Sequence, residues 1–160
     1  MPAAFRTTFL AAGLLCLSAA TAFADPGGRG VDDEVTPWNN EDYRAAVRQI
    51  GLKNFAAAVP LLQKVVAAEP GNADALNQLG FAHRQMGAFD AALGYYRRAL
   101  AIDPEHLGAN EYLGELWLQV GDLAKAEERL EVLDDACFFG CREYDKLRDA
   151  IQAHKQKAGG

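Results

Sequence analysis

Residues that build catalytic and metal sites are scarce in this sequence. Its 160 residues include three cysteines, three histidines and two methionines. His106 is expected in a turn, and no Ser, Cys or second His makes a reasonable catalytic triad with it. The glycines at 27, 28 and 30 are not followed by the phosphate-binding helix of a βαβ unit, so they carry no nucleotide signal. The sequence therefore predicts no catalytic set and no cofactor, and we expect the protein not to be an enzyme.

Charge of one sign is not concentrated anywhere along the chain. The sequence has 16 Lys and Arg against 22 Asp and Glu, a net charge of −6, without a run of five or more like charges. Dispersed charge of this kind is typical of a solvated surface. An acidic protein also repels nucleic acid and anionic lipid, so neither is expected as a partner.

The N-terminus contains an apolar run that is shorter than a membrane-spanning helix. Arg6 provides a positive start, Phe9 to Ala20 form the apolar run, and Ala22-Phe23-Ala24 resembles an A-x-A cleavage site. A spanning helix needs about 20 apolar residues. Residues 1–24 are therefore predicted to be a cleavable signal peptide rather than a retained anchor. The mature protein would be periplasmic or secreted, without membrane insertion.

Residues 25–38 are rich in glycine, proline and aspartate and have no apolar period, which predicts a flexible leader. Trp38 precedes Asn39, a plausible N-cap, so its ring is expected to pack on the first helix. Exposure of Trp38 to a partner is the alternative.

Two amphipathic segments follow one another in residues 73–104 and are separated by Gly87. Each has an apolar stripe of helical period, which predicts two helices joined by a turn. Asp103-Pro104 ends the second helix, because proline disfavours helical geometry in the residue before it. The stripes consist of Leu76, Leu79, Gly80 and His83 in the first segment and of Phe89, Ala92, Leu93, Tyr96, Ala99 and Leu100 in the second.

The same pattern recurs on both sides with a period of about 34 residues. A helix–turn–helix repeat of this length resembles the tetratricopeptide repeat. The outer copies match less well, as expected for repeats that face solvent or a cap. The resemblance implies an all-α solenoid of about three repeats (residues 39–72, 73–106 and 107–138), with residues 139–160 as a capping helix and tail. Pro60 lies inside the second helix of the first repeat, so that helix is expected to be kinked there or to begin near it.

The resemblance also implies a binding surface, because four positions of each inner helix line a concave groove in this family. Carried onto this sequence, the positions are Asn40, Tyr43, Val47 and Ile50, then Asp74, Asn77, Phe81 and Arg84, then Gly108, Glu111, Glu115 and Leu118. Seven of them are predicted to contact a partner peptide or helix. These seven are Tyr43, Val47, Asn77, Phe81, Arg84, Glu111 and Glu115.

Phe81 lies away from the apolar stripe of its helix. It is therefore either an exposed anchor for the partner or a side chain packed against a neighbouring inner helix. The family's carboxylate-clamping pattern of lysine, asparagine and arginine is absent, so capture of a chain-terminal carboxylate is not expected. Its positions hold Tyr43, Val47, Gln78, Gly108 and Tyr112.

Cys137 and Cys141 are the only cysteines left once Cys16 leaves with the signal peptide. An even number in an oxidising compartment predicts a disulfide, here in place of the proline that ends a repeat. A redox-active pair is one alternative, although no strands indicate the βαβ context of such sites. A Cu(I) site is another, but no methionine or histidine lies within a turn of either cysteine.

The leading hypothesis is therefore an exported adaptor that binds a protein partner in its groove and helps to assemble a complex of the cell envelope. A thiol-redox or copper-handling protein that uses Cys137 and Cys141 is the alternative. Self-association of the array is a third possibility.

Overall fold

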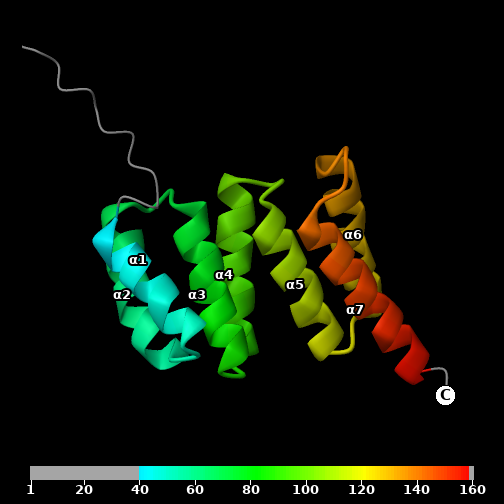
Figure 1. Cartoon of the computed structure of the whole chain (residues 1–160), viewed down its shortest axis with the longest axis horizontal. Helices are drawn as coiled ribbons and strands as arrows, with labels where there is room; N and C mark the ends of the chain where they lie inside the picture. The colour runs from blue at the N-terminus through cyan, green and yellow to red at the C-terminus, as the bar shows by residue number, and fades with distance from the viewer. Residues whose placement is uncertain (1–39, 159–160) are drawn as a thin grey trace, which may run out of the picture. The chain divides into compact units, whose positions relative to one another are not determined.

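The computed structural model describes residues 40–158. Over this range the chain forms seven helices and no strand, which confirms the predicted all-α solenoid (Figure 1). No helix in residues 40–158 is both long and apolar enough to cross a membrane. The predicted signal peptide, the leader, Trp38 and Asn39 lie outside the described residues. The helices are α1 (Glu41–Gly51), α2 (Phe55–Ala68), α3 (Ala73–Gln85), α4 (Phe89–Ile102), α5 (Leu107–Gln119), α6 (Leu123–Ala136) and α7 (Arg142–Ala158).

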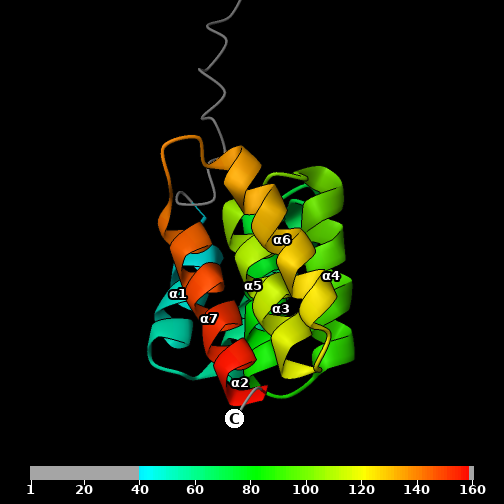
Figure 2. The same ribbon diagram turned by 90° about the vertical axis from the view of Figure 1, so that its right-hand side faces the viewer.

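The helices form two layers. In one layer α1, α3, α5 and α7 contact one another in succession, and α2, α4 and α6 pack behind them. Figure 2 separates α1 and α7 on one side from α4 and α6 on the other. We call the exposed side of the first layer the inner face. Figure 1 shows the turns that follow α1, α3 and α5 at one edge of the stack and the connections that follow α2, α4 and α6 at the opposite edge.

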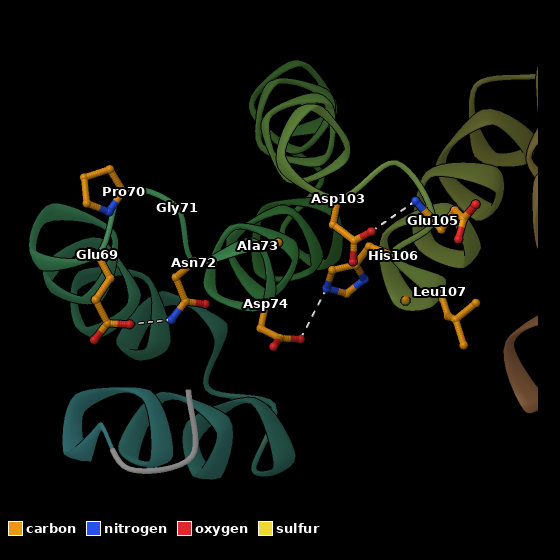
Figure 3. A pocket seen from close by; sticks show the side chains of 11 residues that line it. Glu69, Pro70, Gly71, Asn72, Ala73, Asp74, Asp103, Glu105, His106 and Leu107 are labelled. Carbon is orange, nitrogen blue, oxygen red and sulfur yellow. Dashed lines mark hydrogen bonds and ion pairs between the residues drawn. The ribbon is translucent and has the colours of Figure 1, made fainter. Parts of the chain in front are cut away.

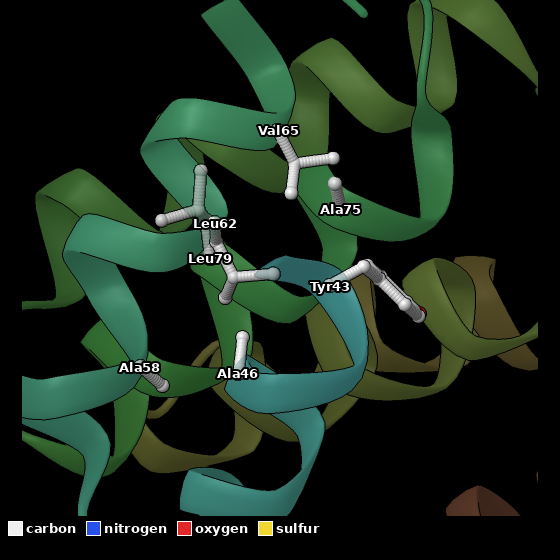
Figure 4. Packing of buried hydrophobic residues seen from close by; sticks show 7 residues of the cluster. All are labelled: Tyr43, Ala46, Ala58, Leu62, Val65, Ala75 and Leu79. Carbon is white, nitrogen blue, oxygen red and sulfur yellow. The ribbon is translucent and has the colours of Figure 1, made fainter. Parts of the chain in front are cut away.

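The core is built from the apolar stripes that the sequence repeats. At the N-terminal end, the side chains of α1, α2 and α3 form one buried cluster (Figure 4). Small residues on these stripes let the helix axes approach, and the leucines fill the space between them. The cluster consists of Tyr43, Ala46, Ala58, Leu62, Val65, Ala75 and Leu79.

Gly80 and Gly114 lie 34 residues apart, each directly after a leucine, and each allows a close contact between helices. A Cβ atom added at Gly80 would lie 2.5 Å from Cε1 of the Tyr96 ring, and one added at Gly114 would lie 2.5 Å from Cδ2 of Leu147. Only glycine permits such close approaches. In the middle repeat, the space beside Gly80 is filled by Tyr96 of the outer helix α4. In the last repeat, the space beside Gly114 is filled by Leu147 of the capping helix α7.

The start of α1 corrects one expectation, and the start of α2 excludes one of the two alternatives offered for Pro60. The N-cap of α1 is Asn40, whose Oδ1 accepts the backbone N–H of Tyr43 at 3.1 Å, and not Asn39. The helix α2 begins at Phe55 and continues through Pro60, so it does not begin near the proline. Proline removes a hydrogen bond to the carbonyl one turn earlier, but the buried stripe on both sides of Pro60 keeps the helix continuous.

Candidate functional site

Four of the seven residues predicted to contact a partner are buried instead, namely Tyr43, Asn77, Arg84 and Glu111. Tyr43, Asn77 and Glu111 occupy the same position in successive repeats and are 2%, 4% and 2% exposed. The inner helices lie close enough to cover this position, and an added Cβ at Gly108 of α5 would lie 2.9 Å from Nδ2 of Asn77. These three side chains are therefore covered by the protein itself.

Arg84 and Glu115 form an ion pair across α3 and α5. The Nη2 atom of Arg84 lies 2.6 Å from Oε2 of Glu115, and the side chains are 4% and 28% exposed. The guanidinium also lies 5.5 Å from the ring centre of Phe81 and 5.6 Å from that of Tyr112, which adds cation–π attraction. The opposite charges satisfy each other, so the pair fixes the floor of the inner face.

Phe81 is half-buried and packs against two other rings. Its ring centre lies 4.9 Å from that of Tyr112 in α5, and 5.9 Å from that of Phe55 in an edge-on contact. Of the two interpretations offered by the sequence, packing against the neighbouring inner helix describes these contacts. Phe81 and Tyr112 are nevertheless each only partly buried.

Lys146 of α7 reaches back onto the inner face. Its Nζ donates to Oε1 of Glu111 at 3.0 Å. Burial raises the pKa of Glu111 above its ordinary value, although the hydrogen bond from Lys146 opposes that rise. The same hydrogen bond raises the pKa of Lys146. The pair ties the capping helix to the last repeat and keeps Glu111 from direct contact with solvent.

The accessible part of the predicted site is a row of half-buried side chains, namely Val47, Phe81 and Glu115, which again share one position of successive repeats. Beside this row lies a shallow cavity of about 290 Å³. Ala150 of α7 contributes to it, which the repeat alignment missed because that alignment stopped before the capping helix. If the 34-residue period is extended by one repeat, Lys146 takes the position of Tyr112. The extended alignment would have shown that α7 is the next inner helix and contributes to the inner face. The cavity is lined by Arg84, Glu115, Leu118, Gln119 and Ala150.

A cavity of about 690 Å³ lies at the edge of the stack between the connections that precede α3 and α5 (Figure 3). Here Nδ1 of His106 accepts the N–H of Ala109 at 3.2 Å and caps α5, while Nε2 lies 3.2 Å from Oδ1 of Asp74. Burial lowers the pKa of His106, but the hydrogen bond and charge of Asp74 outweigh burial and raise it. His106 therefore links two repeats and does not contact another candidate catalytic group.

Cys137 and Cys141 are joined in the expected disulfide, with Cα atoms 5.6 Å apart. The Sγ atom of Cys141 also accepts the N–H of Tyr144 at 3.4 Å, so the disulfide is part of the start of α7. Among residues 40–158, no group of three or more His, Cys, Asp or Glu side chains is placed to hold a metal ion. The pair thus fixes the connection between the last repeat and the capping helix.

Comparison with known proteins supports the repeat assignment. Residues 73–106 match the family model for the tetratricopeptide repeat. No curated protein matches the chain. The fold is similar to that of the chaperone SycD of Yersinia enterocolitica in complex with a peptide of the translocator YopD, at 20% identity and a TM-score of 0.65, covering 79% of this chain and 99% of that one.

Two further solved structures have the same fold. One is PcrH in complex with the chaperone binding region of PopD, at 17% identity and a TM-score of 0.66, covering 76% of this chain and 93% of that one. The other is the Sgt2 TPR domain from Aspergillus fumigatus, at 21% identity and a TM-score of 0.68, covering 78% and 81%. At these identities the similarity is one of fold.

Proposed function

We propose that the protein is an exported adaptor that binds a helix or an extended segment of another protein on its inner face. The observation that carries this proposal is the row of Val47, Phe81 and Glu115, which stays partly accessible although the positions beside it are buried. Rows of this kind give a partner a continuous strip to lie on, one contact for each repeat.

The chemistry of the strip favours a partner with an apolar anchor. Phe81 and Tyr112 form an aromatic surface in the middle of the stack, 4.9 Å apart. Arg84 and Glu115 neutralise each other, and Glu111 is neutralised by Lys146. Because these charges are already paired, apolar contact with the rings provides most of the binding energy, and an aromatic or aliphatic side chain is the best anchor.

Two of the similar structures lend support to this proposal. SycD and PcrH were solved in complex with a peptide of YopD and with the chaperone binding region of PopD, respectively. The present chain would use the same fold to bind a segment of its own partner.

The signal-like residues 1–24 place this activity outside the cytoplasm in our proposal, in the periplasm or beyond the cell. An adaptor there would contribute to the assembly of an envelope complex. N-terminal sequencing of the mature protein tests the location, and a chain that retains Met1 in the cytoplasm would contradict it.

Partner capture by matched variants tests the binding face. Phe81→Ala removes the accessible ring from the inner face, whereas Tyr95→Ala removes another half-buried aromatic ring from α4 in the outer layer. Both side chains are half-buried and contact other rings, so we expect comparable costs in stability, and urea unfolding of the two variants checks this. A difference in capture between equally stable variants then reports binding. We expect at least about a fivefold loss of captured partner for Phe81→Ala, as for an anchor worth more than about 1 kcal/mol, and no loss for Tyr95→Ala. Equal capture by both variants would refute the assignment of the inner face.

A further inference from the structure

The most exposed large apolar side chains among residues 40–158 lie in the loop that the disulfide closes. Phe138 is 87% exposed and Phe139 is 96% exposed. Their rings contact each other edge to face, with centres 5.0 Å apart. We call residues 137–141 the aromatic loop. Adjacent exposed phenylalanines are uncommon on a monomeric surface and mark a contact site.

The aromatic loop is held in one conformation. The disulfide joins its ends, the N–H of Gly140 donates to the carbonyl of Cys137 at 2.7 Å, and Gly140 has a φ of 81°, which favours glycine. A loop fixed in this way loses little conformational entropy when it binds, so even a small contact area gives measurable affinity.

The charges beside the aromatic loop restrict what can cover it. Glu131, Asp134 and Asp135 are exposed in the last turns of α6, and Arg142 is paired with Glu143 at 3.0 Å. An anionic membrane surface is therefore repelled. A symmetric contact between two aromatic loops is disfavoured as well, because it would bring the two sets of carboxylates together. The complementary surface is apolar and carries positive charge.

Such a surface lies at the other end of the same chain. A cavity of about 420 Å³ sits where the α1–α2 turn meets the end of α3, and no acidic residue lines it. Met86 is 43% exposed there, and methionine adapts its shape to an incoming side chain. We call this cavity the Met86 pocket. It is lined by Lys53, Asn54, Phe55, Ala56, Ala57 and Met86.

We infer that the aromatic loop of one copy of this chain docks in the Met86 pocket of a second copy. Figure 1 places the α6–α7 connection and the α1–α2 turn at opposite ends and opposite edges of the stack, so the contact forms between copies and not within one. Lys53 faces the carboxylates of α6 in this arrangement. Because the two surfaces differ, each pair of copies leaves one loop and one pocket free, and the contact is head-to-tail.

The size of the contact sets its strength. Two phenylalanine side chains bury about 300–500 Å² of their own surface. Counting both copies, the total buried area is about twice that value, which is below the roughly 1,200 Å² of a stable interface. The association is therefore weak, with a dissociation constant on the order of 10⁻⁴ M. It becomes significant where the protein is concentrated or held on a common partner.

Sedimentation equilibrium of the purified protein, as isolated from cells that express the full sequence, tests this contact from about 10 μM to about 1 mM. The average mass of the wild type should rise with concentration. The double variant Phe138→Ser and Phe139→Ser, and separately Ala57→Glu, should each remain monomeric. Both changes are at exposed positions, and glutamate is accepted in the first turn of a helix. The matched controls, Ala91→Glu at the equivalent position of α4 and Ile102→Ser at another exposed apolar residue, should associate like the wild type.

Mixing the two monomeric variants separates a head-to-tail contact from a symmetric one. The loop variant keeps an intact pocket and the pocket variant keeps an intact loop, so an equimolar mixture should form a one-to-one dimer that grows no further. A wild type that stays monomeric at about 1 mM, association that survives either change, or a mixture that stays monomeric would each overturn the proposal. It would also be overturned if a monomeric wild type bound phosphatidylcholine vesicles through Phe138 and Phe139, because the loop would then be a membrane contact.

Discussion

Removing the positive charge of Lys146, which ties the capping helix α7 to Glu111 of α5, should destabilise the fold in a pH-dependent way. Lys146→Met keeps most of the length of the side chain in α7 but leaves the carboxylate of Glu111, which is 2% exposed, without the partner it has at 3.0 Å. A buried pair that loses one member typically costs about 3–5 kcal/mol. Lys146 itself is 45% exposed, so water replaces part of the lost interaction. We therefore expect a loss of about 1–3 kcal/mol in unfolding free energy at pH 7.

The pH dependence of this loss identifies its cause. The pKa of Glu111 is raised by burial, so the folded protein holds this proton more tightly than the unfolded chain. Stability from this group is therefore present below the unfolded pKa and falls as pH rises toward the folded pKa. Without Lys146 the rise in pKa is larger, so the variant should lose more stability than the wild type between pH 4 and pH 7. At low pH the two proteins should converge, because a protonated Glu111 needs no counter-ion.

Urea unfolding followed by circular dichroism at several pH values measures both effects. The double variant Glu111→Gln with Lys146→Met provides the control, since a neutral amide leaves no buried charge, and it should recover much of the lost stability. An equal loss at all pH values, or no recovery in the double variant, would show that Lys146 acts through packing and not through charge.

Three further changes follow from the backbone and the disulfide. Gly80→Ala should destabilise the fold by about 1–3 kcal/mol in thermal unfolding, because its Cβ would lie 2.5 Å from the Tyr96 ring, whereas Gly94→Ala, with no atom within 4 Å, should be neutral or stabilising. Lys53 has a φ of 60°, where the equivalent turns have Gly87 and Gly121, so Lys53→Gly should stabilise by up to about 1 kcal/mol; a loss would contradict this account of the turn. Thiol titration of the native protein should find no free thiol and, after reduction, two thiols that do not retain Cu(I) on desalting; stable copper binding would favour the metal hypothesis for Cys137 and Cys141.

The fold could be predicted from the sequence because the apolar pattern that determines it is periodic. Apolar stripes that recur once in every repeat predict helix pairs and their stacking without knowledge of any single contact. Gly87, which separates the two amphipathic segments, and the cysteine pair were visible in the sequence as well. Each of these features depends on residues that are close together in the chain.

The candidate site was less predictable because it depends on the distance between neighbouring helices. Tyr43, Asn77 and Glu111 occupy positions that face the groove in a generic repeat, yet here the inner helices cover them. The role of Lys146 in neutralising Glu111 depends on the angle of α7, which no repeat pattern specifies. The N-cap was misplaced by one residue because Asn39 and Asn40 are chemically equivalent and only the geometry of the first turn distinguishes them.

Crosslinking in intact cells tests the central claim most directly. A photoreactive amino acid at position 81 lies on the inner face, and the same group at position 91 lies on an exposed site of α4 in the outer layer. The account predicts a discrete crosslinked polypeptide from position 81 that is absent from position 91. Identical products from both positions, or none from position 81 while the protein is folded and exported, would contradict it.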